Sequence, residues 1–275
     1  IRDRYKGAGA FVTWNGEAPS VPDANPIVMT GAQAQAIGGS GKNWVSVVKS
    51  SAGASGTMNN LDIDLTAQGP NKTPYQDKQL ILVLSQGGGI NFGGDKLNVV
   101  AKTDFIGGGN NQLAGIYSEA DAGNSMGISA KKVNVDLAST AADGKSVYGV
   151  SSLGGKVNIT SDALNIKLKT STERSGSTQY SETAGISAGT FGNFEGYRGY
   201  VGDITTSANT VVDVNVESTT ATATKPNNDS EFGGGSPVFG IRSEGGLINL
   251  AGTNKVTAVA NGCLLYTSPS PRDRS

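Results

Sequence analysis

Three stretches of the sequence repeat one another: SQGGGINFGGDKLNV at residues 85–99, SLGGKVNITSDALNI at 152–166 and SEGGLINLAGTNKV at 243–256. They share Ser-x-Gly-Gly-x-(Ile/Val)-Asn-apolar, then a short polar step and another strand; the third copy has one extra residue in that step. An apolar run leads into each copy (LILVL, SVYGV and PVFGI), and similar lead-ins without the Gly-Gly pair occur at 114–118 and 184–188. Self-similarity at a spacing of tens of residues indicates a repeat architecture.

A second series of short segments alternates apolar and polar residues. It comprises LDIDL from Leu61, LNVVA from Leu97, VNVDL from Val133, LNIKL from Leu164, VDVNV from Val212 and VTAVA from Val256. A period of two places the apolar side chains on one face of a strand and Asp, Asn, Thr or Lys on the other. The segments begin 36, 36, 31, 48 and 44 residues apart. We therefore expect about six related units, the later ones lengthened by insertions.

These repeats predict an all-β fold, a right-handed parallel β-helix (solenoid) of about six coils with variable outward loops, over residues 44–262. Each unit has one apolar face per strand and can bury it only by stacking on a neighbour. The Gly-Gly steps suit corners at which the backbone takes positive φ. An antiparallel sandwich and a propeller are the alternatives that fit this period. Residues 1–43, with three prolines and no clear unit, are expected to be an irregular N-terminal segment or a first coil.

Two sets of polar residues are candidate sites. Asn91, Asn158 and Asn249 recur at equivalent positions, and we expect a structural ladder that is hydrogen bonded from coil to coil; a ligand-facing row is the alternative. Asp62 and Asp64 share one outward face, about 7 Å apart by strand geometry, and paired carboxylates serve glycosidases and lyases. Alternating Asp also keeps the outer face of a strand hydrated, and the sequence places no Arg or Lys consistently beside this pair.

Composition excludes several kinds of active site. The chain has no histidine and one cysteine, which removes His-based acid–base catalysis, Ser-His-Asp triads and clusters of Cys or His around a metal. Residues 185–189 fit the G-x-S-x-G nucleophile motif but lack its histidine base. The glycine-rich stretches do not keep the spacing of calcium-binding nonapeptides. We expect no catalytic residue, no cofactor, no metal site and no enzyme activity.

Charge and hydropathy also limit the partners. A formal net charge of −1 and 16% charged residues give no electrostatic case for nucleic acid as a partner. No apolar run is long enough for a transmembrane helix.

One segment is unusually rich in aromatic residues. Phe191, Phe194, Tyr197 and Tyr200 recur every three residues, and Arg198 lies among them. Such a segment can stack on sugar rings or on a partner surface. The alternative is that these side chains fold back to cover a flank of the column. We take the five residues as candidate contacts with a ligand or partner.

The strands VYGVSSLGGKVNI and VFGIRSEGGLINLAGTNKV resemble the passenger region of bacterial autotransporters, the type V secreted surface proteins. The resemblance covers residues 44–262 and carries over no individual functional residue. It implies a non-catalytic β-helical adhesin or structural stalk, at the cell surface and outer membrane or extracellular. It also implies a host-surface glycan or protein as partner, and an outer-membrane barrel in the full-length chain. A secreted carbohydrate-active β-helix enzyme (polysaccharide lyase or glycosidase) and a tail-spike-like structural protein are the alternatives.

The chain ends in CLLYTSPSPRDRS, residues 263–275, which lacks the glycine-rich, alternating pattern of the preceding residues. Its first eleven residues resemble one reading frame of a widely used transposase sequencing adapter. We therefore expect a non-native, disordered tail, a natural chain without cysteine, and a column that is cut at Gly262.

Overall fold

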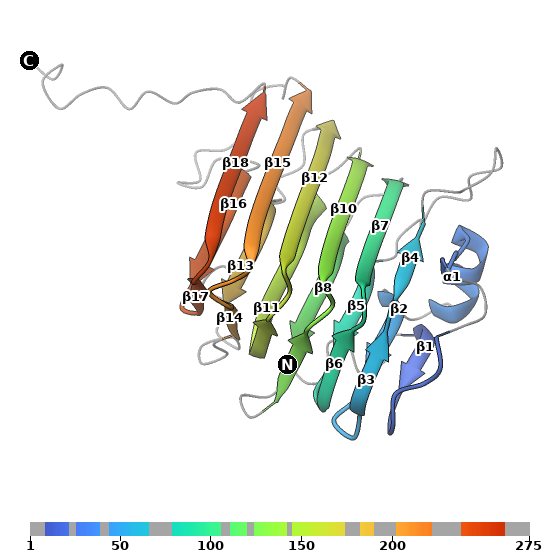
Figure 1. The fold of residues 1–275 in the computed structure, drawn as a ribbon. Coiled ribbons are helices and arrows are strands. Elements are labelled where there is room, and N and C mark those ends of the chain that lie inside the picture. Colours follow the sequence, from blue (N-terminus) through green and yellow to red (C-terminus); the bar gives the residue numbers. More distant parts are fainter. Residues whose placement is uncertain are drawn as a thin grey trace, which may run out of the picture.

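A computed structural model describes residues 9–21, 26–38, 44–65, 79–105, 111–119, 124–141, 145–173, 182–189, 202–221 and 238–261. These ranges hold eighteen strands and one short helix. Every pairing between these strands is parallel, with one isolated antiparallel bridge between Gly189 and Gly245, and the sheets curl around a common interior (Figure 1). The predicted all-β class, built from parallel strands, is confirmed. The tail at 263–275 lies outside the described residues.

The strands fall into three ladders. The first ladder contains β1 (Gly9–Trp14), β2 (Trp44–Ser50), β5 (Gln79–Ser85), β8 (Asn111–Glu119), the start of β11 (Lys145–Ile159), β13 (Thr183–Gly189) and β16 (Val238–Glu244). The second ladder contains β3 (Ser55–Asn59), β6 (Gly89–Gly93), β9 (Ser125–Ile128), the end of β11, β14 (Gly202–Thr206) and β17 (Leu247–Leu250). The third ladder contains β4 (Asp62–Asp64), β7 (Lys96–Phe105), β10 (Lys132–Ala141), β12 (Ala163–Glu173), β15 (Val211–Ala221) and β18 (Thr253–Asn261).

The chain visits the three ladders in a fixed order. We call one pass through all three a unit, and the units are β2–β4, β5–β7, β8–β10, β11–β12, β13–β15 and β16–β18. Because the long strand β11 passes from the first ladder into the second, these two ladders join as one 12-stranded sheet, and the third is a separate 6-stranded sheet. Each ladder therefore advances by one strand per unit.

Strand register matches the sequence repeats along most of the third ladder. Leu97, Val133, Leu164 and Val212, the first residues of four predicted segments, are in register with one another. All four side chains are buried in the core. Burying an aliphatic side chain of this size contributes about 1.5–3 kcal/mol, so each unit added to the stack gains substantially from alternation alone.

The last strand departs from the prediction. Val212 pairs with Asn254, whereas Val256 pairs with Val214. The third copy of the repeat is thus one residue shorter between its two strands, not one longer. Gly252 makes the tight passage possible, since a Cβ there would lie 1.9 Å from the carbonyl oxygen of Thr210. A shift of two residues leaves every side chain on the same face, so alternation could not detect it.

The Gly-Gly corners behave as predicted. Gly88, Gly155 and Gly245, one in each copy of the repeat, have φ values of 88°, 71° and 84°. L-residues with a Cβ rarely adopt this conformation, which explains why glycine recurs there. The expectation of positive φ at these steps is confirmed.

The N-terminal segment adds a partial unit and a helix. Strand β1 pairs with β2, and Ile27 bridges to Ile63 of the third ladder. Helix α1 (Gly31–Gly38) follows and lies at this end of the stack (Figure 1). Thr30 and Gln33 form a capping box, in which the Gln33 backbone N–H donates to Thr30 Oγ1 at 3.2 Å and the Thr30 N–H donates to Gln33 Oε1 at 2.8 Å. This helix was not predicted from the sequence.

Core packing continues from the N-terminal end into the stack. Met29 and Ala34 are fully buried in the same core cluster as Trp14 and Phe92. The rings of Trp14 and Phe92 meet edge to face, with centroids 5.8 Å apart. The Trp14 indole N–H donates to the carbonyl oxygens of Gly16 and Ser55, each at 3.0 Å. Helix α1 and Trp14 thus close one end of the core.

Candidate functional site

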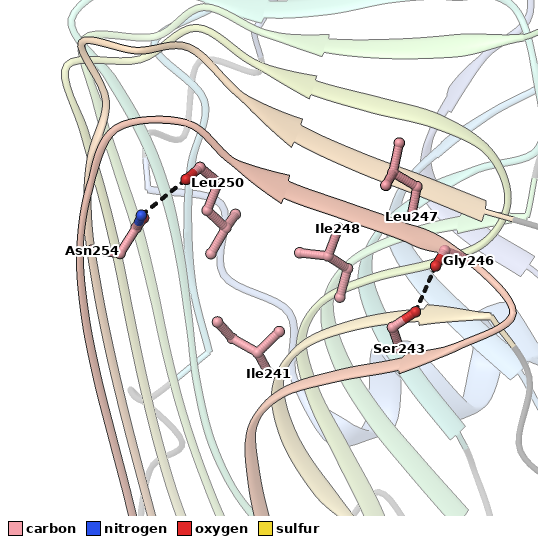
Figure 2. A pocket seen from close by; sticks show the side chains of 7 residues that line it. All are labelled: Ile241, Ser243, Gly246, Leu247, Ile248, Leu250 and Asn254. Carbon is pink, nitrogen blue, oxygen red and sulfur yellow. Dashed lines mark hydrogen bonds between the residues drawn. The ribbon is translucent and has the colours of Figure 1, made fainter.

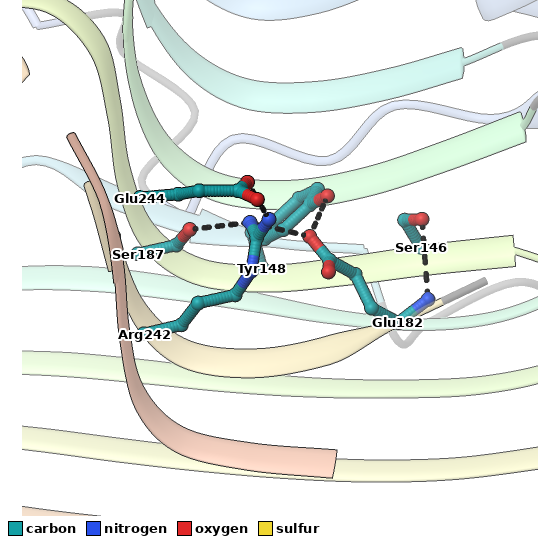
Figure 3. Close-up of polar contacts among 6 residues, drawn as sticks. All are labelled: Ser146, Tyr148, Glu182, Ser187, Arg242 and Glu244. Carbon is teal, nitrogen blue, oxygen red and sulfur yellow. Dashed lines mark hydrogen bonds and ion pairs between the residues drawn. The ribbon is translucent and has the colours of Figure 1, made fainter. Parts of the chain in front are cut away.

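A cluster of buried and partly buried polar and charged side chains lies on the outer face of the first ladder, opposite the core. Figure 3 shows its members, which we call the Arg242 cluster: Ser146, Tyr148, Glu182, Ser187, Arg242 and Glu244. They come from β11, β13 with the residue before it, and β16. Strand register brings them together, since Ser151, Ser187 and Arg242 occupy one row and Tyr148, Ala184 and Phe239 the next.

Arg242 holds the cluster together. Its Nη1 donates to Glu182 Oε1 at 2.9 Å and to Ser187 Oγ at 3.5 Å, and its Nη2 pairs with Glu244 Oε2. Arg242 is 8% exposed and Glu182 is 1% exposed. Buried charges of this kind persist only when they are paired and hydrogen bonded, because desolvation of each ion costs several kcal/mol. One guanidinium therefore pairs with two carboxylates, one from the residue before β13 and one from its own strand β16.

Tyr148 completes the environment of Glu182. Its hydroxyl donates to Glu182 Oε1, and the Glu182 backbone N–H donates to Ser146 Oγ at 3.3 Å. Burial first, and then the negative charge of Glu182, raise the pKa of the Tyr148 hydroxyl well above its ordinary range. Tyr148 therefore stays protonated and remains a hydrogen-bond donor.

Apolar side chains extend this outer face along the ladder. Ile81, Leu84, Ala114, Tyr117 and Leu153 form a second buried cluster, against which the half-buried Tyr148 packs. The Arg242 guanidinium lies 5.9 Å from the ring centroid of Phe239, within cation–π range. The outer face of the first ladder is therefore largely buried, and the charged groups of the Arg242 cluster pair with one another. Glu182, at 1% exposure, cannot meet a polymeric substrate in this arrangement.

The outer face of the third ladder carries a polar row. Its members are in register from unit to unit: Asp62, Asn98, Asn134, Asn165, Asp213 and Lys255. Asn98 Nδ2 donates to Asp62 Oδ1, and Asn134 Nδ2 donates to Asn98 Oδ1, both at 2.7 Å. Each amide thus satisfies its neighbour one unit away.

The sequence places no Arg or Lys consistently beside the Asp62 and Asp64 pair, but the structure brings one lysine to Asp62. Lys96 Nζ forms an ion pair with Asp62, because Lys96 begins the neighbouring strand and its side chain reaches along the face. At the other end of the row, Lys255 Nζ lies 3.9 Å from Asp213 Oδ2. Both Asp62 and Asp213 are engaged by a lysine, and Asp62 also accepts a hydrogen bond from Asn98.

The three predicted asparagines lie in one row of the second ladder. Asn91, Asn158 and Asn249 are in register through Gly127 and Thr205, which lie between them. Amides of this row therefore contact hydroxyl groups: Asn91 Nδ2 donates to Ser129 Oγ at 2.8 Å, and Thr205 Oγ1 donates to Asn158 Oδ1 at 3.0 Å. Direct contacts between amides occur instead in the third ladder.

The serine of the G-x-S-x-G match is buried in β13, where its hydroxyl contacts Arg242. A Cβ on Gly185 would lie 2.3 Å from Val214 Cγ1 and 2.6 Å from the Gly240 carbonyl oxygen, so close packing between units explains this glycine.

The aromatic candidates Phe191, Phe194, Tyr197, Arg198 and Tyr200 lie outside the described residues. In the ranges that the structure covers, no group of three or more acidic, His or Cys side chains is arranged to hold a metal ion. The helix found there is too short and too polar to cross a membrane.

Comparison of the chain with known protein families, curated proteins and solved structures finds no match.

The Arg242 cluster was not predicted from the sequence. A signal was present: Arg242 directly follows the apolar lead-in of the third repeat, Glu244 is the variable residue of its Ser-x-Gly-Gly, and Glu182 directly precedes the strand that contains the lead-in AGISA. Only the strand register shows that these charges face one another.

Proposed function

We propose that the units are coils of a right-handed parallel β-helix. We further propose that the chain is a fragment of the passenger region of a bacterial autotransporter. In this proposal the protein is a non-catalytic adhesin or structural stalk, exposed at the cell surface or secreted. Its full-length chain ends in an outer-membrane barrel, and residues 263–275 derive from adapter DNA.

The observation that carries the proposal is the progression of the ladders. Each of the three ladders gains one parallel strand per unit, in the same order from β2 to β18. A sandwich or a propeller blade is built mainly from antiparallel neighbours, and none of the ladder pairings in the described ranges is antiparallel. A stack that repeats in one direction, with each unit contacting its neighbours, suits a stalk.

The pairing of the charged side chains with one another supports the non-catalytic part of the proposal. In the Arg242 cluster two carboxylates share one guanidinium, and on the third ladder Asp62 is held by Lys96 and Asn98. A catalytic acid or base needs a position within reach of a substrate proton. These groups instead pair with one another, within a unit for Arg242 and Glu244 and between units for the others.

One observation favours a second candidate, a secreted carbohydrate-active enzyme. Acidic and basic side chains do lie together on the outer face of the third ladder, as in the pairs Asp62–Lys96 and Asp213–Lys255. Such a face could bind a charged polysaccharide.

A binding assay with residues 1–262 tests the proposal. Beads coated with the purified chain are expected to bind host cells or members of a glycan array. Tyr197→Ala with Tyr200→Ala should weaken this binding while the circular dichroism spectrum stays the same. Tyr75→Ala, which changes an aromatic residue of another segment, is the matched control and should bind normally.

The outcomes separate the candidates. Cleavage of a polysaccharide by residues 1–262 would overturn the non-catalytic assignment and favour the enzyme. Absence of binding would remove the adhesin role and leave the stalk. Sequencing the locus from source DNA tests the origin of the chain: a downstream barrel is expected, and a gene that encodes CLLYTSPSPRD in place would contradict the account of the tail.

A further inference from the structure

The stack has an open end at its last unit. Among the described strands, β16 pairs only with β13, β17 only with β14 and β18 only with β15. Figure 2 shows the hollow at this end, which is lined by Ile241, Ser243, Gly246, Leu247, Ile248, Leu250 and Asn254. Unlike the first end, where helix α1 packs on the core, this end presents apolar side chains and strand edges.

The exposed side chains belong to rows that are buried in the preceding unit. Ile241 is 38% exposed, whereas Ile186, the residue in register with it on β13, is fully buried. Val256 is 42% exposed, whereas its register partner Val214 is fully buried. In the preceding unit, these rows are covered by the last unit. The last unit therefore exposes the surface that every earlier unit buries against the unit after it.

A row of glycines shows how closely the backbones of successive units approach one another. A Cβ on Gly115, Gly149 or Gly185 would lie 2.5–2.8 Å from the carbonyl oxygen of the corresponding glycine one unit further on. Gly240 continues this row. Within the described residues, the atoms nearest to a Cβ at Gly240 belong to the side chains of Val256 and Ala258 of its own unit, and none is a backbone carbonyl oxygen. Gly240 thus lacks the contact with a following backbone that the other three glycines make, while Val256 Cγ1, 2.2 Å from its Cβ position, already accounts for glycine at this site.

Common protections of a strand edge are scarce here. Strand β18 has the sequence TNKVTAVAN, with one lysine and no proline, and all nine of its residues are exposed. Proteins usually protect an open edge with Pro, several charges, a bulge or a covering helix. An unprotected edge beside an apolar surface is suited to pairing with another strand.

We propose that this end binds a further coil of the same chemistry, which pairs in parallel with β16, β17 and β18 and buries Ile241, Ile248 and Val256. The inference rests on the proposed β-helix. The coil is supplied by polypeptide that follows Gly262 in place of residues 263–275. A second copy fits less well, because helix α1 blocks head-to-tail stacking and tail-to-tail stacking would require antiparallel ladders.

An extended chain tests the proposal. Asn261 is in register with Thr140 through Thr219 and Ser171, so Gly262 corresponds to Ala141. A copy of residues 142–173 placed directly after Gly262 therefore continues all three ladders in register. Hydrogen exchange of the β18 amides is expected to slow by roughly 100-fold or more relative to residues 1–262, as edge strands become interior.

The matched control carries the same extension with Val150→Asp, Val157→Asp and Ile166→Asp in the added copy alone. These changes remove the apolar face and should leave β18 exchanging as fast as in residues 1–262. Equal exchange of β18 in all three chains, with β10 still protected, would overturn the proposal and leave the β-helix intact. Loss of protection in β10 itself would count against the β-helix and therefore against both. A dimer of residues 1–262 with β18 already protected would show that a second copy occupies this end, which also overturns the proposal.

Discussion

The outer faces of the first and third ladders differ sharply, although both ladders bury the same kind of aliphatic row on the inside. The outer face of the first ladder is largely buried, and the Arg242 cluster brings three of its charged side chains into contact. The outer face of the third ladder is polar and largely open, with amide contacts and lysine pairs between units. The inward apolar rows therefore stabilise the stack in both ladders. The two outer faces differ in how much free energy of unfolding each polar side chain contributes.

The largest effect is expected at the centre of the buried cluster. Arg242→Met leaves Glu182 and Glu244 near one another without their shared guanidinium, and removing one partner of a buried ion pair costs about 3–5 kcal/mol. Urea unfolding should show a loss of this size. The double variant Arg242→Met with Glu182→Gln should recover part of it, because the remaining buried group is then neutral. A loss below about 1 kcal/mol in the single variant would mean that the two faces do not differ as described.

Tyr148→Phe should have the next largest effect at neutral pH. Hydrogen bonds to charged groups contribute about 1.5–3 kcal/mol, and this change removes the one that Tyr148 donates to Glu182. Urea unfolding at pH 7 measures the loss, with Tyr5→Phe as a matched control that lies outside the described residues.

The same tyrosine predicts a dependence on alkaline pH. Its pKa is raised in the folded state, so its contribution is fully present below the unfolded pKa of about 10 and is lost as pH rises through the folded pKa. The free energy of unfolding of the wild-type chain should therefore fall more steeply above pH 10 than that of Tyr148→Phe. Parallel slopes in the two chains would contradict the burial of this hydroxyl.

Asn134→Ala, on the third ladder, should cost about 1 kcal/mol, since it removes one neutral hydrogen bond at a half-buried position. Asn215→Ala, on the same outer face, is a useful comparison because Asn215 takes part in no amide contact among the described residues. A loss at Asn134 as large as that of Arg242→Met would erase the contrast between the faces.

The smallest effect is expected for Lys169→Ala. Its ammonium lies 3.9 Å from Glu217 Oε2, and both side chains are well exposed. Exposed pairs of this kind contribute about 0–1 kcal/mol, so the midpoint of urea unfolding should barely move. A clear destabilisation would show that the third face depends on its charges as much as the first.

Features that depend on local pattern could be predicted from the sequence. Alternation identified the inward rows, and the Gly-Gly repeats identified the corners with positive φ. The register of Val256 was mispredicted because a shift of two residues preserves the facing of every side chain. Helix α1 was missed, although Thr30 and Gln33 have the spacing of a capping box.

The candidate site was harder to predict because it depends on contacts between units. Glu182 and Arg242 meet only because β13 and β16 pair in one register across a long intervening segment. Likewise, Asn91 and Asn158 share a row, but Gly127 of the unit between them separates their amides. Neither fact can be read from a single repeat.

In-register parallel stacking of the units is the central claim, and disulfide trapping tests it directly. Residues 1–262 contain no cysteine, so pairs can be introduced cleanly. Asn134→Cys with Asn165→Cys places two cysteines in register on adjacent strands. Their Cα atoms are about 4.8 Å apart, within the range of a disulfide. Asn134→Cys with Lys167→Cys is offset by two residues on the same face, roughly 8 Å apart and beyond that range. Rapid oxidation of the first pair alone is the predicted result; equal oxidation of both pairs, or of the offset pair alone, would contradict the account.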